Sequence, residues 1–321
     1  MLFILVVHYT GAAFGLPSRE ELQGEPSAGM LLRTLFESIS IIGVDCFVLI
    51  SGYYGIRATW KGLVSYVLWC LSASLLVWVA ECVWHGHFLG DELWTAIRIF
   101  SATDLWFVPA YLALYLLSPV LNGGWSALTR RRKYLFLAGV IFLNVYLGWW
   151  CGGKMNPFGY NVMQLVFVYF IGRLLADEKA VLSRIRPRGW LLLYLLFTAC
   201  IFGSAFILNV RMAYAYNAPA VLLSAVSLFM VFAVMRQRHI PWVNWVASSA
   251  FMVYLIHKSP WLWRLQRDCL LEMRDSLSGM QFVLGCIALA LVVFAGSVLI
   301  DKVRSAMTTP LLRRLFPPRT L

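Results

Sequence analysis

The chain has 321 residues, of which 61% are apolar and 13% carry a charged side chain. Soluble domains are about a quarter charged, so this composition excludes an ordinary soluble domain and predicts a multi-pass membrane protein. The net charge of +12 would suit a nucleic-acid-binding protein, but basic residues also gather in the cytoplasmic loops of membrane proteins. We therefore expect a lipid bilayer, and no nucleic acid, among the partners of this chain.

Long apolar runs follow one another along the whole chain. A helix needs about 20 largely apolar residues to cross a hydrocarbon core roughly 30 Å thick. The runs that predict transmembrane helices cover residues 1–16, 38–56, 63–84, 105–121, 134–150, 160–176, 190–208, 218–235, 243–263 and 281–300. The connections are short and no internal repeat is visible. We therefore expect an all-α fold with about ten transmembrane helices in a single domain over residues 1–321.

The loops between these predicted helices alternate in charge. Most of the 27 basic residues lie after the second, fourth, sixth and eighth predicted helices and in the C-terminal tail, with few acids beside them. The other set of loops holds most of the acids, including Asp91 and Glu92. Because cytoplasmic loops of membrane proteins are rich in Lys and Arg, this alternation predicts that both termini are cytoplasmic.

Ionisable side chains inside the apolar runs are the first candidates for function. His8, Asp45, Glu81 and His257 occupy such positions, and each costs about 3 kcal/mol or more inside a bilayer, so each is expected to face a site, a cavity or a partner. Histidine is the side chain best suited to accept a proton near neutral pH. For His8 and His257, a hydrogen bond to a neighbouring helix remains an equally plain explanation.

The second predicted helix carries a stripe of small and polar residues. Ser38, Asp45 and Gly52 are spaced by seven, so they share one face of a helix. Small residues on such a face permit close helix packing, which explains Ser38 and Gly52 but not the carboxylate of Asp45. Asp45 therefore serves either a site or a buried pair with another helix. Arg33 and Glu37, at the entrance to this helix, are interpreted as an interfacial pair.

A metal site is not expected. His85 and His87 lie near Asp91 and Glu92 in a predicted outer loop. This loop has no helical or strand register to fix the ligands, whereas a catalytic zinc ion needs three positioned ligands.

Four sequence segments resemble, in order and spacing, the membrane-bound acyltransferase family 3. They are GVDCFVLISGYYGIR, DLWFVPAYLALYLLSP (104–119), VFVYFIGRLL (166–175) and SSAFMVYLIHKSP (248–260). Each segment alone is mostly apolar and therefore weak, but the ordered set covers nearly the whole chain.

This resemblance implies about ten transmembrane helices and the transfer of an acyl group, usually acetyl from acetyl-CoA, to a hydroxyl of a cell-surface or lipid-linked glycan. It implies no permanently bound cofactor. His8 corresponds to the family's histidine in the first helix and would be the general base, and Asp45 would orient its imidazole. The substrate-binding residues would be Ser51, Gly52, Tyr53, Arg57, Lys61, Trp106, Tyr254 and His257. The family's R-x-x-R pair is replaced here by Arg57 and Lys61.

The first apolar run is short for a transmembrane helix. Met1 to Gly15 would span about 22 Å as a helix, and the family's basic residue, eleven positions before His8, would precede Met1. We therefore expect Met1 to be an internal methionine of a longer natural chain.

Two other classes of protein remain open. A transporter or flippase for a glycan or amphiphile is the alternative, although such proteins favour broken helices and inverted repeats, and a membrane scaffold comes third. Because the loops are short and no further domain is attached, we expect a multi-pass protein of the bacterial inner membrane.

Overall fold

A computed structural model describes residues 1–101, 105–152, 155–236 and 238–316; Asp104, which begins the second motif, lies outside them. The chain is 81% helical and the described residues form no strand, which confirms the predicted all-α class.

Six helices among the described residues are long and apolar enough to cross a membrane, and they confirm a multi-pass membrane protein. They are Ala28–Tyr54, Trp60–His85, Phe107–Ala127, Arg130–Trp150, Pro187–Ser204 and Gly279–Pro310. Two shorter apolar helices, Leu2–Ala13 and Pro219–Val234, coincide with further predicted runs. The number of ten and the cytoplasmic position of both termini stay predictions.

Several of the predicted runs are divided or form shorter helices than expected. Within Ala28–Tyr54, a turn at Ile41 and Ile42 separates α3 (Ala28–Ser40) from α4 (Gly43–Tyr54). The run 160–176 becomes α9 (Val162–Asp177), which has 16 residues and is therefore about 24 Å long. The run 243–263 is divided into α14 (Pro241–Ala247), α15 (Ala250–His257) and the start of α16 (Pro260–Ser276). Both α14 and α16 begin with proline, which fits the first turn of a helix but not its interior.

The chain forms two compact units, each assembled from segments far apart in the sequence. Unit 1 comprises Met1–Leu5, Ala58–Pro109 and Arg238–Leu321, and unit 2 comprises Val6–Arg57 and Ala110–Gln237. The helices α1 (Leu2–Val7) and α7 (Phe107–Ala127) contribute residues to both units. The single domain over residues 1–321 stays a prediction.

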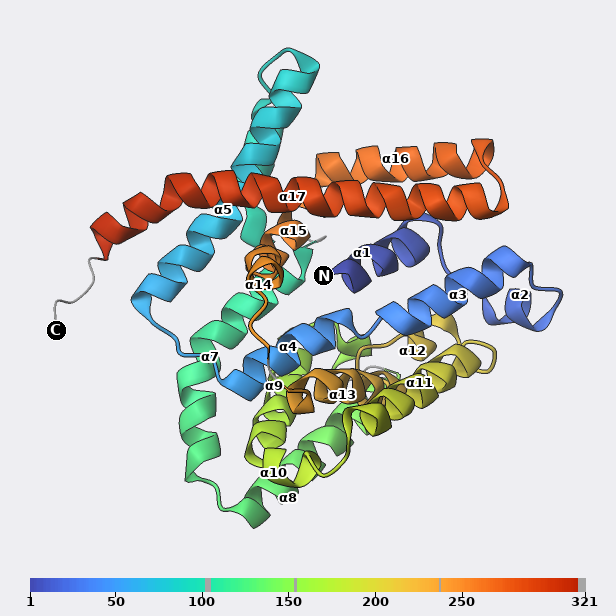
Figure 1. The fold of residues 1–321 in the computed structure, drawn as a ribbon, viewed down its shortest axis with the longest axis vertical. Helices are drawn as coiled ribbons and strands as arrows, with labels where there is room; N and C mark the ends of the chain where they lie inside the picture. The colour runs from blue at the N-terminus through green and yellow to red at the C-terminus, as the bar shows by residue number, and fades with distance from the viewer. Residues whose placement is uncertain (102–104, 153–154, 237, 317–321) are drawn as a thin grey trace. The chain divides into compact units, whose positions relative to one another are not determined.

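Unit 2 is built around α4, which packs against α9 and α13, while α11 packs against α13 and α3 (Figure 1). Its elements are the π-helix η1 (His8–Ala13), α2 (Arg19–Gln23), α3 (Ala28–Ser40), α4 (Gly43–Tyr54), α8 (Arg130–Phe142), the π-helix η4 (Leu143–Trp150), the 3-10 helix η5 (Pro157–Gly159), α9, α10 (Lys179–Leu182), α11 (Pro187–Ser204), α12 (Val210–Ala213) and α13 (Pro219–Val234).

The contact between α4 and α9 depends on two glycines. A Cβ atom on Gly172 would lie 2.6 Å from the carbonyl oxygen of Leu49 and 2.9 Å from the backbone nitrogen of Tyr53. A Cβ atom on Gly52 would overlap the backbone carbonyl of Tyr169. Small residues let two helix backbones approach closely in a membrane. The close packing predicted for Gly52 is therefore confirmed.

Unit 1 is built around α5 and α17. Its elements are α5 (Trp60–His85), α6 (Gly90–Ile97), the 3-10 helix η2 (Ile99–Ser101), α14, α15, α16 and α17 (Gly279–Leu315). The short helix α15 packs against both α5 and α17, and α16 lies beside α17 (Figure 1).

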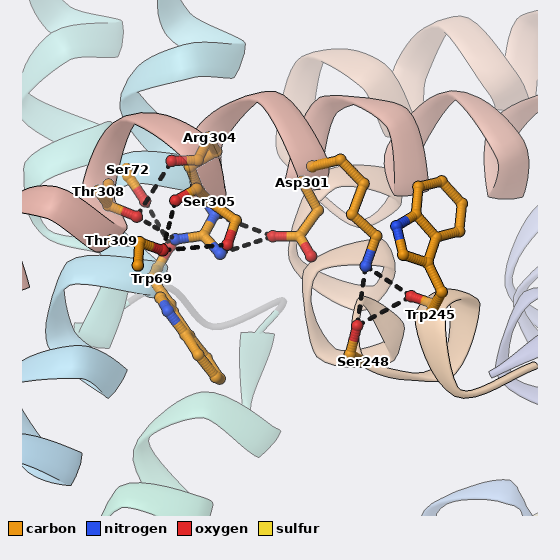
Figure 2. A network of polar contacts seen from close by, with 10 residues as sticks. Trp69, Ser72, Trp245, Ser248, Asp301, Arg304, Ser305, Thr308 and Thr309 are labelled. Carbon is orange, nitrogen blue, oxygen red and sulfur yellow. Dashed lines mark hydrogen bonds and ion pairs between the residues drawn. The ribbon is translucent and has the colours of Figure 1, made fainter. Parts of the chain in front are cut away.

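A buried ion pair lies in the C-terminal half of α17. Asp301 and Arg304 are each 5% exposed, and Arg304 Nη2 donates to Asp301 Oδ1 at 2.6 Å. The guanidinium also lies over the ring of Trp69 on α5, 5.6 Å from its centroid (Figure 2). One residue away, Lys302 Nζ donates to Ser248 Oγ at 2.8 Å. The two buried charges of Asp301 and Arg304 compensate each other. The contacts of Arg304 with Trp69 and of Lys302 with Ser248 attach this half of α17 to α5 and to the end of α14.

Candidate functional site

A network of five buried polar side chains lies inside unit 2. Asp45 belongs to α4, Gln164 to α9 and Asn144 to η4, while Asn156 precedes η5 and Asn217 precedes α13. None of the five is more than 2% exposed. Buried polar groups of this kind are costly unless they are hydrogen-bonded to one another.

The direction of the hydrogen bonds is fixed from Asp45 outward. Gln164 Nε2 donates to Asp45 Oδ1 at 3.1 Å and to the carbonyl oxygen of Tyr216 at 2.9 Å. The carbonyl oxygen of Tyr216 can only accept, so Gln164 Oε1 must face the other way, where it accepts from Asn144 Nδ2 at 2.9 Å and Asn156 Nδ2 at 3.3 Å. The contacts of Gln164 with Tyr216 and Asp45 therefore set the orientation of three amide side chains.

Three oxygen atoms of this network have no hydrogen-bond partner among the residues that the structure describes. They are Asp45 Oδ2, Asn156 Oδ1 and Asn217 Oδ1, and all are buried. The orientation of Asn217 is settled because its Nδ2 donates to the carbonyl oxygen of Asn156 at 2.9 Å. All three atoms are acceptors. The network can therefore accept hydrogen bonds from a hydroxyl group or from water.

His8 begins the π-helix η1 and is half-buried. Two residues further on, the hydroxyl of Thr10 is hydrogen-bonded to the carboxylate of Glu37 on α3, which is 2% exposed. A Cβ atom on Gly11 would stand 3.5 Å from Glu37 Oε1, in ordinary van der Waals contact. The segment that carries His8 is thus attached to a buried carboxylate. π-Helical turns are frequent at functional sites.

Arginine side chains lie at the C-terminal end of α4. This helix ends at Tyr54 and is followed by Gly55, whose positive φ of +74° favours glycine. A Cβ atom there would also lie 2.8 Å from Arg173 Nη1. Arg173 Nε is buried and has no hydrogen-bond partner within the described part of the chain. Arg57, two residues beyond Gly55, is exposed. This end of α4 is therefore cationic and offers guanidinium donors.

The remaining predicted binding residues of α4 contact neighbouring helices. Ser51 Oγ lies 3.1 Å from the hydroxyl of Tyr111, and the ring of Tyr53 packs edge-on against Phe229 with centroids 5.1 Å apart. Together with the packing of Gly52, these contacts account for the residues structurally. Their role in substrate binding stays a prediction.

Unit 1 holds the other predicted binding residues. The rings of Tyr254 and His257 lie 6.0 Å apart on α15, and Tyr254 packs against Phe107 at 5.8 Å. The His257 side chain is fully buried, and its Nδ1 lies 2.7 Å from the carbonyl oxygen of Val253. A carbonyl can only accept, so Nδ1 carries a proton.

Two further predicted residues of unit 1 are more accessible. Trp106 is half-buried with its ring 5.9 Å from that of Phe107, and Lys61 is exposed at the beginning of α5. The structure therefore brings Trp106, Tyr254 and His257 into one aromatic region through Phe107. It places Lys61 at the N-terminal end of α5.

The family model described as an acyltransferase domain, that of acyltransferase family 3, matches residues 1–302. The chain belongs to this family. No curated protein and no solved structure matches the chain.

Sequence reasoning missed several residues of this acyltransferase. Glu37 was assigned to a pair with Arg33, but Arg33 Nη1 donates to the carbonyl oxygen of Gly15 at 3.0 Å, whereas Glu37 is buried against Thr10. Arg173 is absent from the predicted site residues, although it lies in the segment VFVYFIGRLL (166–175) that carries the family resemblance. The four amide residues around Asp45 gave no signal at all, because they are uncharged.

Replacing Gln164 by methionine should destabilise the acyltransferase by at least about 2 kcal/mol. The change keeps the volume but leaves Asp45 Oδ1 and the amide of Asn144 buried without their hydrogen bonds, and each such loss costs about 1–3 kcal/mol. Denaturant unfolding in detergent micelles measures the effect. Gln23→Met, which removes one exposed hydrogen bond to the carbonyl of Phe206, is the control. Equal losses in the two variants would contradict a central role for the network.

Proposed function

We propose that this acyltransferase transfers an acetyl group from acetyl-CoA to a hydroxyl of a cell-surface or lipid-linked glycan, with His8 as the general base. Membership of the family supports the transfer of an acyl group. The observation that carries the assignment of His8 is its position on a π-helix attached to the buried Glu37 through Thr10.

The proposed reaction requires a general base. A sugar hydroxyl is a poor nucleophile, and a base within hydrogen-bond distance removes its proton as the oxygen attacks the thioester carbonyl. A bond forms between that oxygen and the acetyl carbon, the carbon–sulfur bond breaks, and coenzyme A leaves as its thiolate. The proton passes to His8 and then to the thiolate or to solvent. In this proposal Asp45 takes no proton itself and serves to orient the imidazole of His8.

The cationic end of α4 suits the donor. Acetyl-CoA carries phosphate groups, and guanidinium side chains bind phosphates through several directed hydrogen bonds. Arg57 is exposed there, and Arg173 stands beside Gly55 with donor capacity to spare. Lys61 follows soon after in the sequence. The donor would therefore bind at the face that the loop charges predict to be cytoplasmic, and the acceptor would arrive from the other face of a bacterial inner membrane.

Replacing Arg173 by glutamine should raise the KM for acetyl-CoA about tenfold or more with a smaller change in kcat. A hydrogen bond to a charged group contributes about 1.5–3 kcal/mol, which is tenfold or more in affinity. Steady-state kinetics at varied acetyl-CoA concentration measure the change. Arg184→Gln, which alters an exposed basic residue of the same predicted face, is the matched control. An unchanged KM in Arg173→Gln would assign donor binding elsewhere.

Isolated membranes supplied with acetyl-CoA labelled in the acetyl group test the function as a whole. The proposal predicts that label appears in an alkali-labile ester on a glycan, only in membranes that contain the protein. Movement of a glycan across the membrane without consumption of acetyl-CoA would instead identify a transporter or flippase.

A further inference from the structure

Unit 1 contains a cavity of about 210 Å³ between α5, α6 and the beginning of α16. Its lining includes Trp78 and Glu81 from α5, Asp91 and Glu92 from α6, and Trp261 and Arg264 from α16. This cavity is part of neither the Asp45 network nor the cationic end of α4, because both of those belong to unit 2.

The planar groups of the cavity are held in place by their neighbours. Arg264 Nη2 donates to Glu81 Oε1 at 3.1 Å, with the Glu81 side chain 8% exposed and that of Arg264 62% exposed. Trp78 Nε1 donates to the carbonyl oxygen of Leu89 at 2.8 Å, which fixes its ring. The ring of Trp261 packs against Trp84 with centroids 6.2 Å apart. The lining is therefore organised before any ligand binds, which lowers the cost of binding.

The chemistry of the lining identifies one class of ligand. Among the described residues of the lining, three carboxylates stand against one guanidinium. This acidic lining disfavours an anion such as acetyl-CoA. Carboxylates accept hydrogen bonds from hydroxyl groups, and indole rings offer flat apolar faces with a polar edge. Hydroxyl groups around an apolar ring face are the features of a sugar. The volume is below the roughly 300–1,000 Å³ of sites for drug-sized ligands, so it suits a single sugar residue.

From this lining we infer that the cavity binds one neutral sugar residue of the acceptor glycan, with Glu81 and Asp91 accepting from its hydroxyls and Trp261 packing on its ring. The inference rests on the proposed function for its choice of acceptor. Asp91 and Glu92, on α6, belong to the connection between two predicted transmembrane helices whose charge predicts the outer face. This is the side from which the proposed acceptor arrives.

Saturation-transfer NMR on the full chain in lipid nanodiscs tests the inference directly. Methyl glucoside, galactoside, mannoside and rhamnoside serve as neutral probes, and methyl glucuronide provides the same ring with a carboxylate. We expect saturation transfer to at least one neutral glycoside and at least about tenfold weaker binding of the glucuronide to the acidic lining. Glu81→Gln and Asp91→Asn should each weaken binding about tenfold, as expected for loss of a hydrogen bond to a charged group.

Asp275→Asn is the matched control, because Asp275 is an exposed carboxylate on α16 outside the cavity and paired with Arg274. Unchanged binding in both cavity variants, or equal loss in the control, would overturn the inference. Asp91→Asn keeps the test valid if Glu81→Gln does not fold, since Asp91 is exposed. Acetyl transfer without glycoside binding would refute the inference that the cavity binds a sugar and would leave the proposed function standing. Glycoside binding that depends on Glu81, without acetyl transfer, would refute the proposed function alone.

Discussion

Replacing His8 by alanine should lower acetyl transfer to the glycan by about 10²–10⁴-fold, the range that a general base contributes. On the proposed mechanism the loss should fall on kcat, because the variant would still bind acetyl-CoA at the cationic end of α4 but would have no group to take the proton of the hydroxyl. Transfer of label from acetyl-CoA to glycan in isolated membranes, normalised to the amount of inserted protein, measures this effect.

The control for this prediction is His85→Ala, which removes an exposed histidine at the end of α5. It should transfer label at the rate of the unaltered chain. A thermal midpoint of His8→Ala close to that of the unaltered protein shows that the helix bundle is intact. If His8→Ala kept most of its activity, the base would have to be another group, and Glu37 beside the same π-helix would be the next residue to replace.

The six long helices were predictable because their signal is local. Each contains an apolar run of 18 residues, and a bilayer imposes this length. The division of 243–263 was harder to foresee. Its apolar composition is continuous, but Pro241 and Pro260 start new helices and Ser248 and Ser249 lie between α14 and α15. Mean hydropathy is taken over a window of residues, so it does not reveal a short break between two helices of similar composition.

The surroundings of Asp45 were not predictable in the same way. Its burial followed from the cost of a carboxylate in an apolar run, and the structure shows the carboxylate 1% exposed. Its hydrogen-bond partner, however, is Gln164, 119 positions away. Finding that partner requires the packing of α4 against α9. Asn and Gln side chains carry no charge, so they stand out much less in an apolar sequence than His, Asp or Glu.

The burial of Glu37 was missed for a related reason. At the predicted entrance of a transmembrane helix, an acid four residues after a base fits an exposed helical pair. The structure instead directs Arg33 to the carbonyl of Gly15 and Glu37 to Thr10. This choice depends on where η1 packs on α3, and no spacing within residues 33–37 contains that information.

Replacing Gly52 by alanine should destabilise the acyltransferase by about 3 kcal/mol or more, at the upper end of what overpacking costs. The new methyl group would overlap the backbone carbonyl of Tyr169. A side chain in that place could change its rotamer, but a helix backbone cannot, so α4 and α9 would have to separate. The Asp45–Gln164 hydrogen bond joins the same two helices and would be stretched by this movement.

Gly139→Ala is the same chemical change, but it is expected to raise the stability of the protein. Gly139 lies inside α8, and apart from the backbone of its own helix no described atom lies within 4 Å of an added Cβ. Alanine should therefore stabilise the protein by up to about 1 kcal/mol through helix propensity. Denaturant unfolding of both variants in the same detergent compares them. A Gly52→Ala protein as stable as Gly139→Ala would mean that α4 and α9 do not approach through Gly52. Acetyl transfer should follow stability in this series, since Gly52→Ala displaces Asp45 and Gly139→Ala does not.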